Sequence, residues 1–416
     1  MTLTDCDFTR AKLLPVPENN LYSATCSVTI PNMYAVFVSS STFTDVNHVY
    51  RNNNFSSARG NGLYYTNTAV FNNRSQLLID GNVLGAESAY FGTLCQSAST
   101  HYYYALYLRS PTLDLVLGVN NQYDSGIISV NMYKSTLIDI RYDNLDGLEV
   151  FYYAPSGCKI YVLGSQIRYI YTTFGACQNP VLELSNASTT IPSTLDLGTT
   201  VNSHVLIHND SDITASINIV GGKVVGTTFE ITNTTVGGLS LPATMINSTI
   251  LIHENAFNGY SDVVIFRDCN HHNTSVHAYN NNIFASGAAY GMGFIYCIIT
   301  QGTHLYTNNT IRARNSVVYI SNTADNKTVA TLDRNTFIAT NYTLEATTFN
   351  MNLRHPRTEK HIGPNADIRL FPNSDDHPFE LYDAQVRHIT MEFPNGPVRS
   401  IDIQNTTAAG HLQIRT

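Results

Sequence analysis

An asparagine between two apolar residues recurs at nearly constant spacing in the second half of the chain, and this repeat constrains the fold more than any other feature. Four segments align without gaps and place their polar residue at Asn255, Asn282, Asn309 and Asn335, at intervals of 27, 27 and 26 residues. An apolar residue stands three positions before each Asn, and another stands two positions after it. The chain therefore repeats one structural unit with a period of about 25–30 residues.

The same template fits the first half of the chain, where Asn53 and Asn82 occupy its polar position 29 residues apart. Looser matches replace the Asn with Ser110, Ser135, Ser165 and Thr227. The sequence thus predicts a ladder of stacked asparagines at Asn53, Asn82, Asn255, Asn282, Asn309 and Asn335.

Short repeats of this kind have an economical physical explanation. One unit cannot bury its apolar face alone, whereas stacked units give every residue a copy of itself above and below. Because neighbouring parallel strands lie about 4.8 Å apart, a polar side chain that recurs once per coil can hydrogen-bond to its own copies. Asn also tolerates the left-handed backbone that a sharp corner needs. The pattern predicts an all-β solenoid with coils of about 25–30 residues that turn at the Asn.

Other solenoids fit less well, because leucine-rich repeats need a leucine frame that is sparse here and tetratricopeptide or ankyrin units are helical. The spacing resembles that of right-handed parallel β-helix proteins of the pectate-lyase-like superfamily, whose coils carry the same apolar-x-x-Asn-x-apolar signature and an internal Asn ladder. The resemblance covers roughly residues 35–350. It implies a fold and not an activity, since the superfamily includes polysaccharide lyases and hydrolases, phage tailspikes, adhesins and structural virion proteins.

Charge is scarce in this chain. Only 13% of the residues are charged while 43% are hydrophobic, and 23 Lys and Arg against 31 Asp and Glu leave a net charge of −8. Such a composition excludes a charge-rich disordered chain. Lys and Arg form no run longer than two, which argues against a nucleic-acid partner.

The ends of the chain differ from its middle. Residues 1–34 contain Pro15, Pro17 and Pro31 and little periodicity, which predicts an N-terminal cap or arm. Residues 35–354 are expected to form the parallel β-helix. Six of the 14 Pro fall in residues 355–416, where we expect a small antiparallel β unit that caps the solenoid or docks onto partners.

The first twenty residues lack the basic and apolar regions of a secretory signal, and no stretch of 18 apolar residues is present, so we expect no membrane insertion. Either the protein is made and assembled in a cell without Sec export, as virion proteins are, or the numbering begins after a removed segment, and we expect the first because the sequence begins with Met.

The seven cysteines are Cys6, Cys26, Cys95, Cys158, Cys177, Cys269 and Cys297, and none forms a CxxC pair. Buried free thiols are the favoured interpretation. Disulfides between Cys158 and Cys177 or between Cys6 and Cys26 stay open as alternatives.

Residues with catalytic or metal-binding chemistry do not converge. The resemblance implies acidic residues on neighbouring coils for a lyase and paired Asp for a hydrolase, but the one Asp pair, Asp375 and Asp376, lies in the Pro-rich tail. The acids Glu254, Asp262, Asp268 and Asp333 occupy different template positions. We therefore predict no catalytic residue, no metal ligand and no cofactor.

Histidine and tyrosine offer weaker candidates. His277 and His304 share one template position, which allows a stack on adjacent coils, although coincident surface histidines are the favoured interpretation. His271 and His272 are expected in a turn, with the same interpretation. The runs at residues 102–104 and 152–153 offer tyrosines for sugar stacking, although alternation between core and surface explains them more simply.

Acceptor sequences for N-glycosylation are numerous, and many lie beside the predicted turns. They occur at Asn54, Asn73, Asn186, Asn209, Asn233, Asn247, Asn273, Asn308, Asn326, Asn341 and Asn405.

The function that the sequence favours is a structural or attachment protein, a rigid β-helical rod on a virion surface or in an extracellular assembly. Its expected partners are other copies of the chain, neighbouring structural proteins and surface glycans. The alternative is a carbohydrate-active enzyme, either a pectinase-like lyase or hydrolase or a tailspike depolymerase.

Overall fold

The computed structural model describes residues 2–4, 34–38, 42–44, 47–55, 61–65, 70–72, 76–85, 104–108, 115–119, 121–124, 127–132, 137–153, 156–209, 212–241, 244–260, 262–287, 290–324, 329–346, 350–354, 357–358, 367–370, 379–382, 385–386, 389–392, 401–405, 407–408 and 412–415. All regular elements within these ranges are β-strands. The chain divides into unit 1, Met1–Cys177 with Ala187–Thr189, and unit 2, Gln178–Asn186 with Thr190–Thr416.

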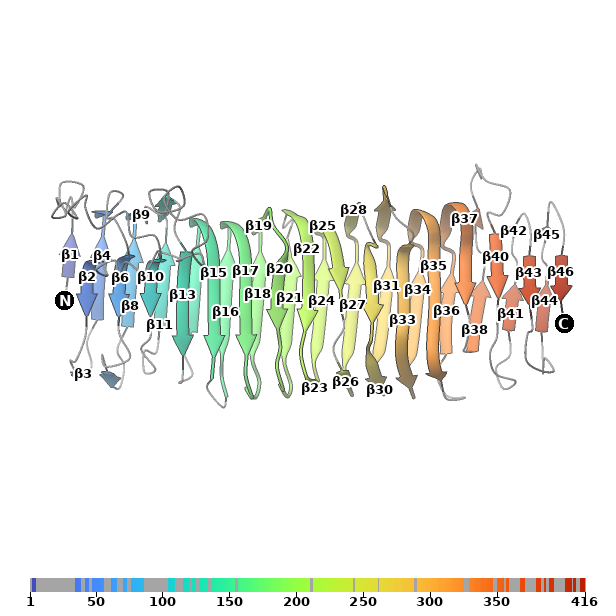
Figure 1. Ribbon diagram of the computed structural model, residues 1–416, viewed down its shortest axis with the longest axis horizontal. Helices are drawn as coiled ribbons and strands as arrows, with labels where there is room; N and C mark the ends of the chain where they lie inside the picture. The colour runs from blue at the N-terminus through green and yellow to red at the C-terminus, as the bar shows by residue number, and fades with distance from the viewer. Residues whose placement is uncertain are drawn as a thin grey trace, which may run out of the picture. The chain divides into compact units, whose positions relative to one another are not determined.

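Unit 1 contains two main sheets of parallel strands (Figure 1). Its first sheet runs in the order β1 (Thr2–Thr4), β4 (Asn47–Arg51), β8 (Gln76–Asp80), β11 (Leu115–Val119), β14 (Leu137–Arg141) and β16 (Lys159–Leu163). Its second sheet contains β2 (Tyr34–Val38), β5 (Asn54–Phe55), β6 (Asn61–Tyr65), β9 (Val83–Gly85), β10 (Tyr104–Leu108), β12 (Gln122–Asp124), β13 (Ile127–Met132), β15 (Asn144–Tyr152), β17 (Gln166–Phe174) and β19 (Ser188–Thr189). A small sheet pairs β3 (Thr42–Thr44) with β7 (Val70–Asn72).

Unit 2 repeats this plan. Its first sheet runs in the order β18 (Val181–Ser185), β21 (His204–His208), β24 (Thr228–Thr232), β27 (Thr249–His253), β31 (Ser275–Tyr279), β34 (Thr303–Thr307), β36 (Val329–Asp333), β38 (Asn350–Arg354), β41 (Phe379–Tyr382) and β44 (Ile401–Gln404).

The second sheet of unit 2 contains β20 (Ser193–Asp196), β22 (Asp212–Val220), β23 (Lys223–Val225), β25 (Thr235–Ser240), β26 (Thr244–Ile246), β28 (Ala256–Gly259), β29 (Val264–Arg267), β30 (Asn270–His272), β32 (Asn282–Ala285), β33 (Tyr290–Thr300), β35 (Thr310–Ala324), β37 (Thr336–Ala346), β39 (Arg357–Thr358), β40 (Asp367–Leu370), β43 (Ile389–Glu392) and β46 (Leu412–Arg415). A small sheet pairs β42 (Gln385–Val386) with β45 (Thr407–Ala408).

Each unit is a parallel β-solenoid, which confirms the predicted all-β class. Alternate residues of the first-sheet strands are buried, as Phe229 and Ile231 in β24 and Ile250 and Ile252 in β27 show. In-register pairing then places Ile231 beside Ile252 and Ile252 beside Ala278. The core is therefore a column of apolar side chains, to which every coil contributes at the same positions.

A left-handed residue ends most strands of the first sheet. Asn52, Asn233, Asn280 and Asn308 have φ between 48° and 56°, and Gly81 has φ 62° at the equivalent corner. Asn and Gly reach this conformation at low cost, which explains why the corners select them. The next residue along the chain points inward and is buried.

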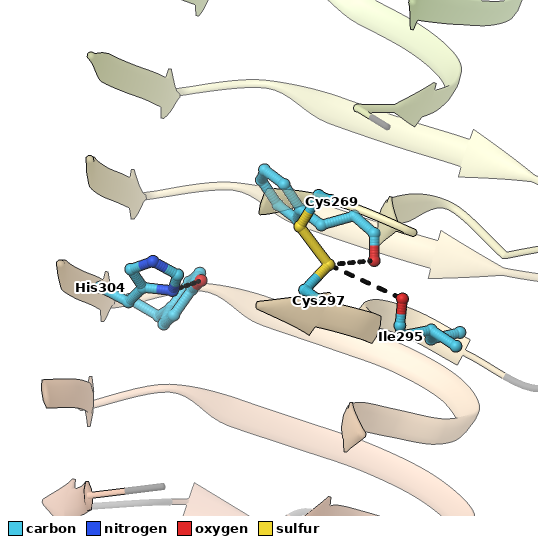
Figure 2. The surroundings of a disulfide bond; sticks show 6 residues. Cys269, Ile295, Cys297 and His304 are labelled. Atoms are coloured by element: carbon cyan, nitrogen blue, oxygen red, sulfur yellow. Dashed lines mark hydrogen bonds between the residues drawn. A yellow bond between two sulfur atoms is a disulfide. The ribbon is translucent and has the colours of Figure 1, made fainter. Parts of the chain in front are cut away.

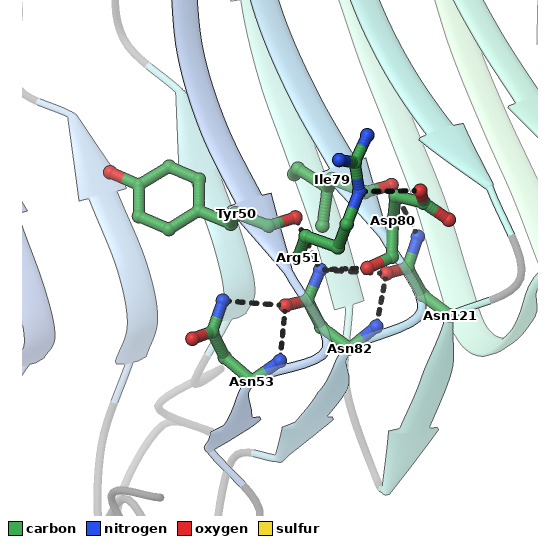
Figure 3. Close-up of polar contacts among 7 residues, drawn as sticks. All are labelled: Tyr50, Arg51, Asn53, Ile79, Asp80, Asn82 and Asn121. Atoms are coloured by element: carbon green, nitrogen blue, oxygen red, sulfur yellow. Dashed lines mark hydrogen bonds and ion pairs between the residues drawn. The ribbon is translucent and has the colours of Figure 1, made fainter. Parts of the chain in front are cut away.

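These buried corner residues form the internal ladder, which Figure 3 shows in unit 1. Asn82 Oδ1 accepts hydrogen bonds from the backbone N and from Nδ2 of Asn53, both at 2.9 Å. Asn82 Nδ2 donates to the Tyr50 carbonyl at 2.9 Å and to Asn121 Oδ1 at 3.1 Å. The ladder continues from Asn121 to Asp143, with 2.7 Å between the Asn121 backbone N and Asp143 Oδ1.

Unit 2 contains the same ladder. It runs through Thr234, Asn255, Asn281, Asn309 and Asn335, and each Asn accepts a hydrogen bond at 2.9–3.1 Å from the backbone N of the preceding member. Asn255, Asn281, Asn309 and Asn335 also donate through Nδ2 to a carbonyl of the preceding coil. The buried Asn side chains thereby have hydrogen-bond partners, as buried polar groups in folded proteins require.

The structure places five of the predicted ladder residues in the ladder and corrects the sixth. Asn53, Asn82, Asn255, Asn309 and Asn335 are buried ladder members, whereas Asn282 is exposed and begins β32. Its neighbour Asn281 takes the buried position. The prediction was wrong by one residue because it assumed equal coil lengths, and the true intervals here are 26, 28 and 26 residues.

The weaker matches are corrected in part. Ser165 is a ladder residue and accepts from the Asp143 backbone N at 3.1 Å. Asn121 and Asp143 occupy the ladder between Asn82 and Ser165, while Ser110 and Ser135 lie outside the described residues. Thr227 is buried at a different corner, where its backbone N donates to Ser248 Oγ at 3.1 Å.

The C-terminal segment continues the parallel stacking. β38, β41 and β44 pair in parallel, and so do β40, β43 and β46. The antiparallel pairing expected beyond residue 355 is therefore wrong for the described strands, because alternation of apolar residues marks a strand without fixing its direction. At the other end β1 pairs in parallel with β4, and residues 5–33 lie outside the described residues. The predicted domain boundaries stay predictions.

Candidate functional site

The outer face of the first sheet in unit 2 carries a row of acids and imidazoles. Strand register places Glu183 beside Leu206, Leu206 beside Glu230, and Glu230 beside Leu251. These residues alternate with buried core residues and so point away from the core. The neighbouring outward column contains Ser185 and His208 on adjacent strands.

Two acid–imidazole pairs connect these columns. His208 Nε2 lies 3.0 Å from Glu183 Oε1, and His253 Nε2 lies 3.2 Å from Glu230 Oε1. In both pairs the Glu belongs to one coil and the His to the next. The two pairs are two coils apart, a separation of about 10 Å at the usual strand spacing. We call these four residues the acid–imidazole row.

The imidazole of the second pair makes two further contacts. His253 Nδ1 lies 3.1 Å from Thr232 Oγ1, and the His253 ring stacks on Tyr279 with centroids 4.7 Å apart. Contacts on both ring nitrogens and on one ring face fix the orientation of this imidazole. Desolvation, then the charges of Glu254 and Glu230, raise the pKa of Tyr279. The Tyr279 hydroxyl therefore stays protonated at neutral pH.

This row can accept hydrogen bonds and exchange protons at the molecular surface. Its side chains remain partly exposed, with 30% of Glu183 and 26% of Glu230 accessible. Carboxylates oriented by imidazoles are suited to bind hydroxyl groups or cations. Within the described residues no group of three or more His, Cys, Asp or Glu is placed to hold a metal ion. Glu254 and Asp268 occupy left-handed corners, and Asp262 and Asp333 contact Arg267 and Arg334.

The sequence did not reveal this row. Glu183 and Glu230 lie 47 positions apart, and His208 and His253 lie 45 apart, so their proximity depends on the lengths of the intervening coils. Strand register brings them together, and register could not be assigned for the coils between residues 165 and 227. The alternation of the strands does predict that these residues face outward.

The stack of His277 on His304 does not form, and the favoured interpretation of both as surface histidines is wrong for His304. His277 pairs with Leu305, while His304 pairs with Val276 and is buried in the core. The error has the same origin as that at Asn282, since His277 was aligned to Asn282 instead of Asn281. His271 and His272 lie in strand β30 rather than in a turn, with His271 fully buried and His272 exposed.

His271 and His304 form a buried pair in unit 2, with ring centroids 6.4 Å apart. Neither nitrogen of His271 has a hydrogen-bond partner, and desolvation lowers its pKa to about 4. Desolvation, then the charges of His271 and His277, lower the pKa of His304 to about 3. Both rings are neutral at physiological pH. This pair is inaccessible to solvent and is therefore a core feature rather than a binding site.

Two disulfides correct the interpretation of the cysteines as free thiols. Cys269 and Cys297 are joined on adjacent coils near His304 (Figure 2), and Cys158 is joined to Cys177 in unit 1. The second pairing is one of the two alternatives that the sequence left open, and the first was not anticipated. Cys6, Cys26 and Cys95 lie outside the described residues.

Corner geometry explains most of the glycosylation sequences. Seven of them begin at an exposed left-handed Asn, namely Asn186, Asn209, Asn233, Asn247, Asn273, Asn308 and Asn405. A buried residue commonly follows, as at Thr234, and a Ser or Thr then begins the next strand, as at Thr235. The motif thus arises from a corner followed by a β-prone residue. Asn54 begins β5 and Asn341 lies within β37, while Asn73 and Asn326 lie outside the described residues.

The remaining sequence candidates fall into three groups. Tyr152 is buried and Tyr153 is 49% exposed, as alternation predicts. Tyr104 begins β10. Four candidates lie outside the described residues, namely Asp375, Asp376, Tyr102 and Tyr103.

Among the described residues no helix is long and apolar enough to cross a membrane.

Comparison of the chain with protein-family models, with curated proteins and with solved structures finds no match.

Proposed function

We propose that the protein is a structural or attachment protein, a rigid β-solenoid rod that serves on a virion surface or in another extracellular assembly. The internal ladder carries this proposal. In unit 2 it links Thr234 to Asn335 through five buried corners in succession, with side-chain and backbone hydrogen bonds at each step. A protein whose buried polar groups serve the stacking of coils is built for stiffness.

The disulfides support an extracellular location. Pairs such as Cys269 with Cys297 persist in oxidising environments and are rare where glutathione keeps thiols reduced. The exposed left-handed asparagines also present their side chains at corners, where glycans can project without disturbing the sheets. We include N-glycosylation at these corners in the proposal.

We further propose that the solenoid is right-handed and of the pectate-lyase-like kind. Support comes from the apolar-x-x-Asn-x-apolar signature and from the parallel, in-register pairing of first-sheet strands such as β24, β27 and β31. A crossover between parallel strands of one sheet is right-handed in nearly all proteins, because right-twisted strands pack back onto the sheet only in that sense.

Electron microscopy and light scattering of the purified full-length chain test the structural role. We expect elongated particles that associate with one another or with neighbouring structural proteins. Compact particles that remain monomeric at every concentration would contradict the proposal. Mass spectrometry of the protein from its native source would show which corner asparagines carry glycans.

A carbohydrate-active enzyme is the second candidate, and the acid–imidazole row favours it. Glu183 and Glu230 point outward two coils apart, near the upper end of the carboxylate separation of about 6.5–9.5 Å in inverting glycoside hydrolases. Incubation with a panel of neutral and acidic polysaccharides, with and without calcium, tests this candidate. If the protein is an enzyme, it should release oligosaccharide, Glu230→Gln should abolish this release, and the corner variant Glu254→Gln should leave it intact. That result would establish the enzyme and contradict the purely structural proposal.

A further inference from the structure

A strip of aromatic side chains lies on the outer face of the second sheet in unit 1. Strands β15 and β17 pair in parallel, with Gly147 beside Tyr169, Glu149 beside Tyr171, and Phe151 beside Thr173. The intervening residues, such as Val150 and Thr172, are fully buried. Gly147, Glu149, Phe151, Tyr169 and Tyr171 therefore share the outward face. We call the last four of these residues the aromatic strip.

Tyr169 lies across the neighbouring coil instead of standing upright. A Cβ atom added to Gly147 would lie 2.4 Å from Tyr169 Cζ, so the ring covers the position that a side chain would fill. The Tyr169 hydroxyl donates to Glu149 Oε1 at 3.0 Å. The glycine lets the ring lie on the backbone, and the carboxylate fixes its outer end. The ring is thus held in one orientation before any ligand arrives.

The other two rings extend this surface. Tyr171 is 38% exposed, and its ring centroid lies 5.6 Å from that of Phe151 at an interplanar angle of 50°. The strip therefore combines pre-oriented aromatic faces with a carboxylate between them.

The chemistry of the strip suits one class of ligand. Aromatic faces attract the C–H groups of a pyranose ring, and an oriented carboxylate accepts hydrogen bonds from its hydroxyls. A carboxylate has about four lone-pair positions, so Glu149 can accept a ligand hydroxyl while it holds Tyr169. Its negative charge repels acidic sugars and phosphates. We propose that the aromatic strip is a binding site for a neutral oligosaccharide, an inference that rests on the proposed attachment role and names its ligand class.

Three variants of the full-length chain test this site. Tyr171→Ala removes an exposed ring, Tyr169→Phe removes the hydroxyl that holds Glu149, and Gly147→Ala keeps every ring but forces Tyr169 off the backbone. Tyr260→Ala is the matched control. Tyr260 is 80% exposed in unit 2 and also lies over a glycine, Gly287, and the structure assigns it no carboxylate partner.

Affinity electrophoresis and calorimetry would measure binding of soluble neutral oligosaccharides, namely β-linked glucans, mannans and chitin fragments, with polygalacturonate as the acidic comparison. We expect at least one neutral oligosaccharide to bind, and we expect Tyr171→Ala and Gly147→Ala to weaken it about tenfold, the loss of one aromatic contact. Tyr260→Ala should bind like the wild type.

The outcomes separate this site from the proposed function. Absence of binding to every neutral oligosaccharide, or binding that the strip variants leave unchanged, would overturn the site even if the protein forms rods. Preference for polygalacturonate would also overturn it. Compact monomers by microscopy would contradict the structural role without affecting the binding result. Circular dichroism and the melting temperature of each variant establish that it is folded.

Discussion

Asn281 and Asn282 are neighbours in the chain, yet only Asn281 belongs to the ladder. Asn281 Oδ1 accepts from the backbone N and Nδ2 of Asn255, and its own Nδ2 donates to the Ile252 carbonyl and to Asn309 Oδ1. Asn282 is exposed at the start of β32. This adjacency offers a controlled test of the ladder within a single corner.

We predict that Asn281→Leu lowers the free energy of unfolding by more than about 3 kcal/mol, because it leaves several buried polar groups without partners at about 1–3 kcal/mol each. Asn282→Leu should change it by less than about 0.5 kcal/mol, as an exposed substitution does. Urea unfolding of both variants measures the difference. Equal effects of the two substitutions would show that the ladder does not stabilise this corner.

His271 provides the second prediction at this scale. Its pKa falls from 6.5 in the unfolded chain to about 4 in the folded protein, because burial disfavours the charged ring. The stabilisation from its neutral form is complete above pH 6.5 and is lost as the pH falls towards 4, because the unfolded chain then binds a proton that the folded protein excludes. At about 1.4 kcal/mol per pKa unit the loss reaches about 3 kcal/mol near pH 4.

The variant His271→Leu should flatten this pH dependence without lowering stability at pH 7, because it removes two unpaired nitrogens from the core. His272→Gln, at the exposed neighbouring position, is the control. The free energy of unfolding of the wild type and of His271→Leu would be measured between pH 7 and pH 4. If both lose stability in parallel, His271 is not the source of the acid sensitivity.

At the scale of the element, the sequence predicts corners better than registers. The buried Asn between two apolar residues marks a corner because the left-handed residue and the apolar residues that pack inward on either side of it lie within six consecutive residues. The run Asn280, Asn281 and Asn282 fits the template in two frames, with either Ala278 and Ile283 or Tyr279 and Phe284 as its apolar pair. Burial of Ala278 and Ile283 decides between them. Alternation through Val276 and Ala278 was the available signal.

The acid–imidazole row and the aromatic strip were beyond prediction for a related reason. Each forms between strands of adjacent coils, and coil length varies, since successive ladder residues in unit 1 are separated by 29, 39 and 22 positions. Loops of such different length change register without changing the pattern inside a strand. The template therefore identifies which residues face outward and leaves open which of them meet.

The inter-coil disulfide is a testable element of unit 2. Cys269 and Cys297 are separated by 28 residues. Closing a loop of this length stabilises a protein by about 3–4 kcal/mol, largely through the unfolded chain. Replacing both cysteines with Ala should lower the melting temperature of unit 2, and the corresponding Cys158 and Cys177 double variant should act on unit 1. Unchanged melting of the wild type in reducing agent, together with equal numbers of reactive thiols in the unfolded protein with and without reductant, would exclude both disulfides.

At the scale of the whole molecule, stability rests on stacked coils rather than on charge. Only 13% of the residues are charged. The ion pair between Arg51 and Asp80 is solvent-exposed, with side-chain exposures of 49% and 32%, and Arg267 with Asp262 is similarly open. Exposed pairs of this kind contribute about 0–1 kcal/mol each. Ladder hydrogen bonds and apolar columns are buried, and salt does not screen them appreciably.

Stability should therefore depend weakly on ionic strength. Raising sodium chloride from about 0.01 M to about 1 M shortens the screening length from about 30 Å to about 3 Å, which removes most surface electrostatics. We expect the free energy of each urea-unfolding transition to change by less than about 1 kcal/mol, because the weakened ion pairs and the relieved repulsion of a net charge of −8 are both small and act in opposite directions. The m-value, which is the slope of unfolding free energy against urea concentration, should stay constant because the surface area exposed on unfolding does not change. A loss of several kcal/mol at high salt would show that surface ion pairs hold the coils together, and an equally large gain would show that charge repulsion opposes their stacking.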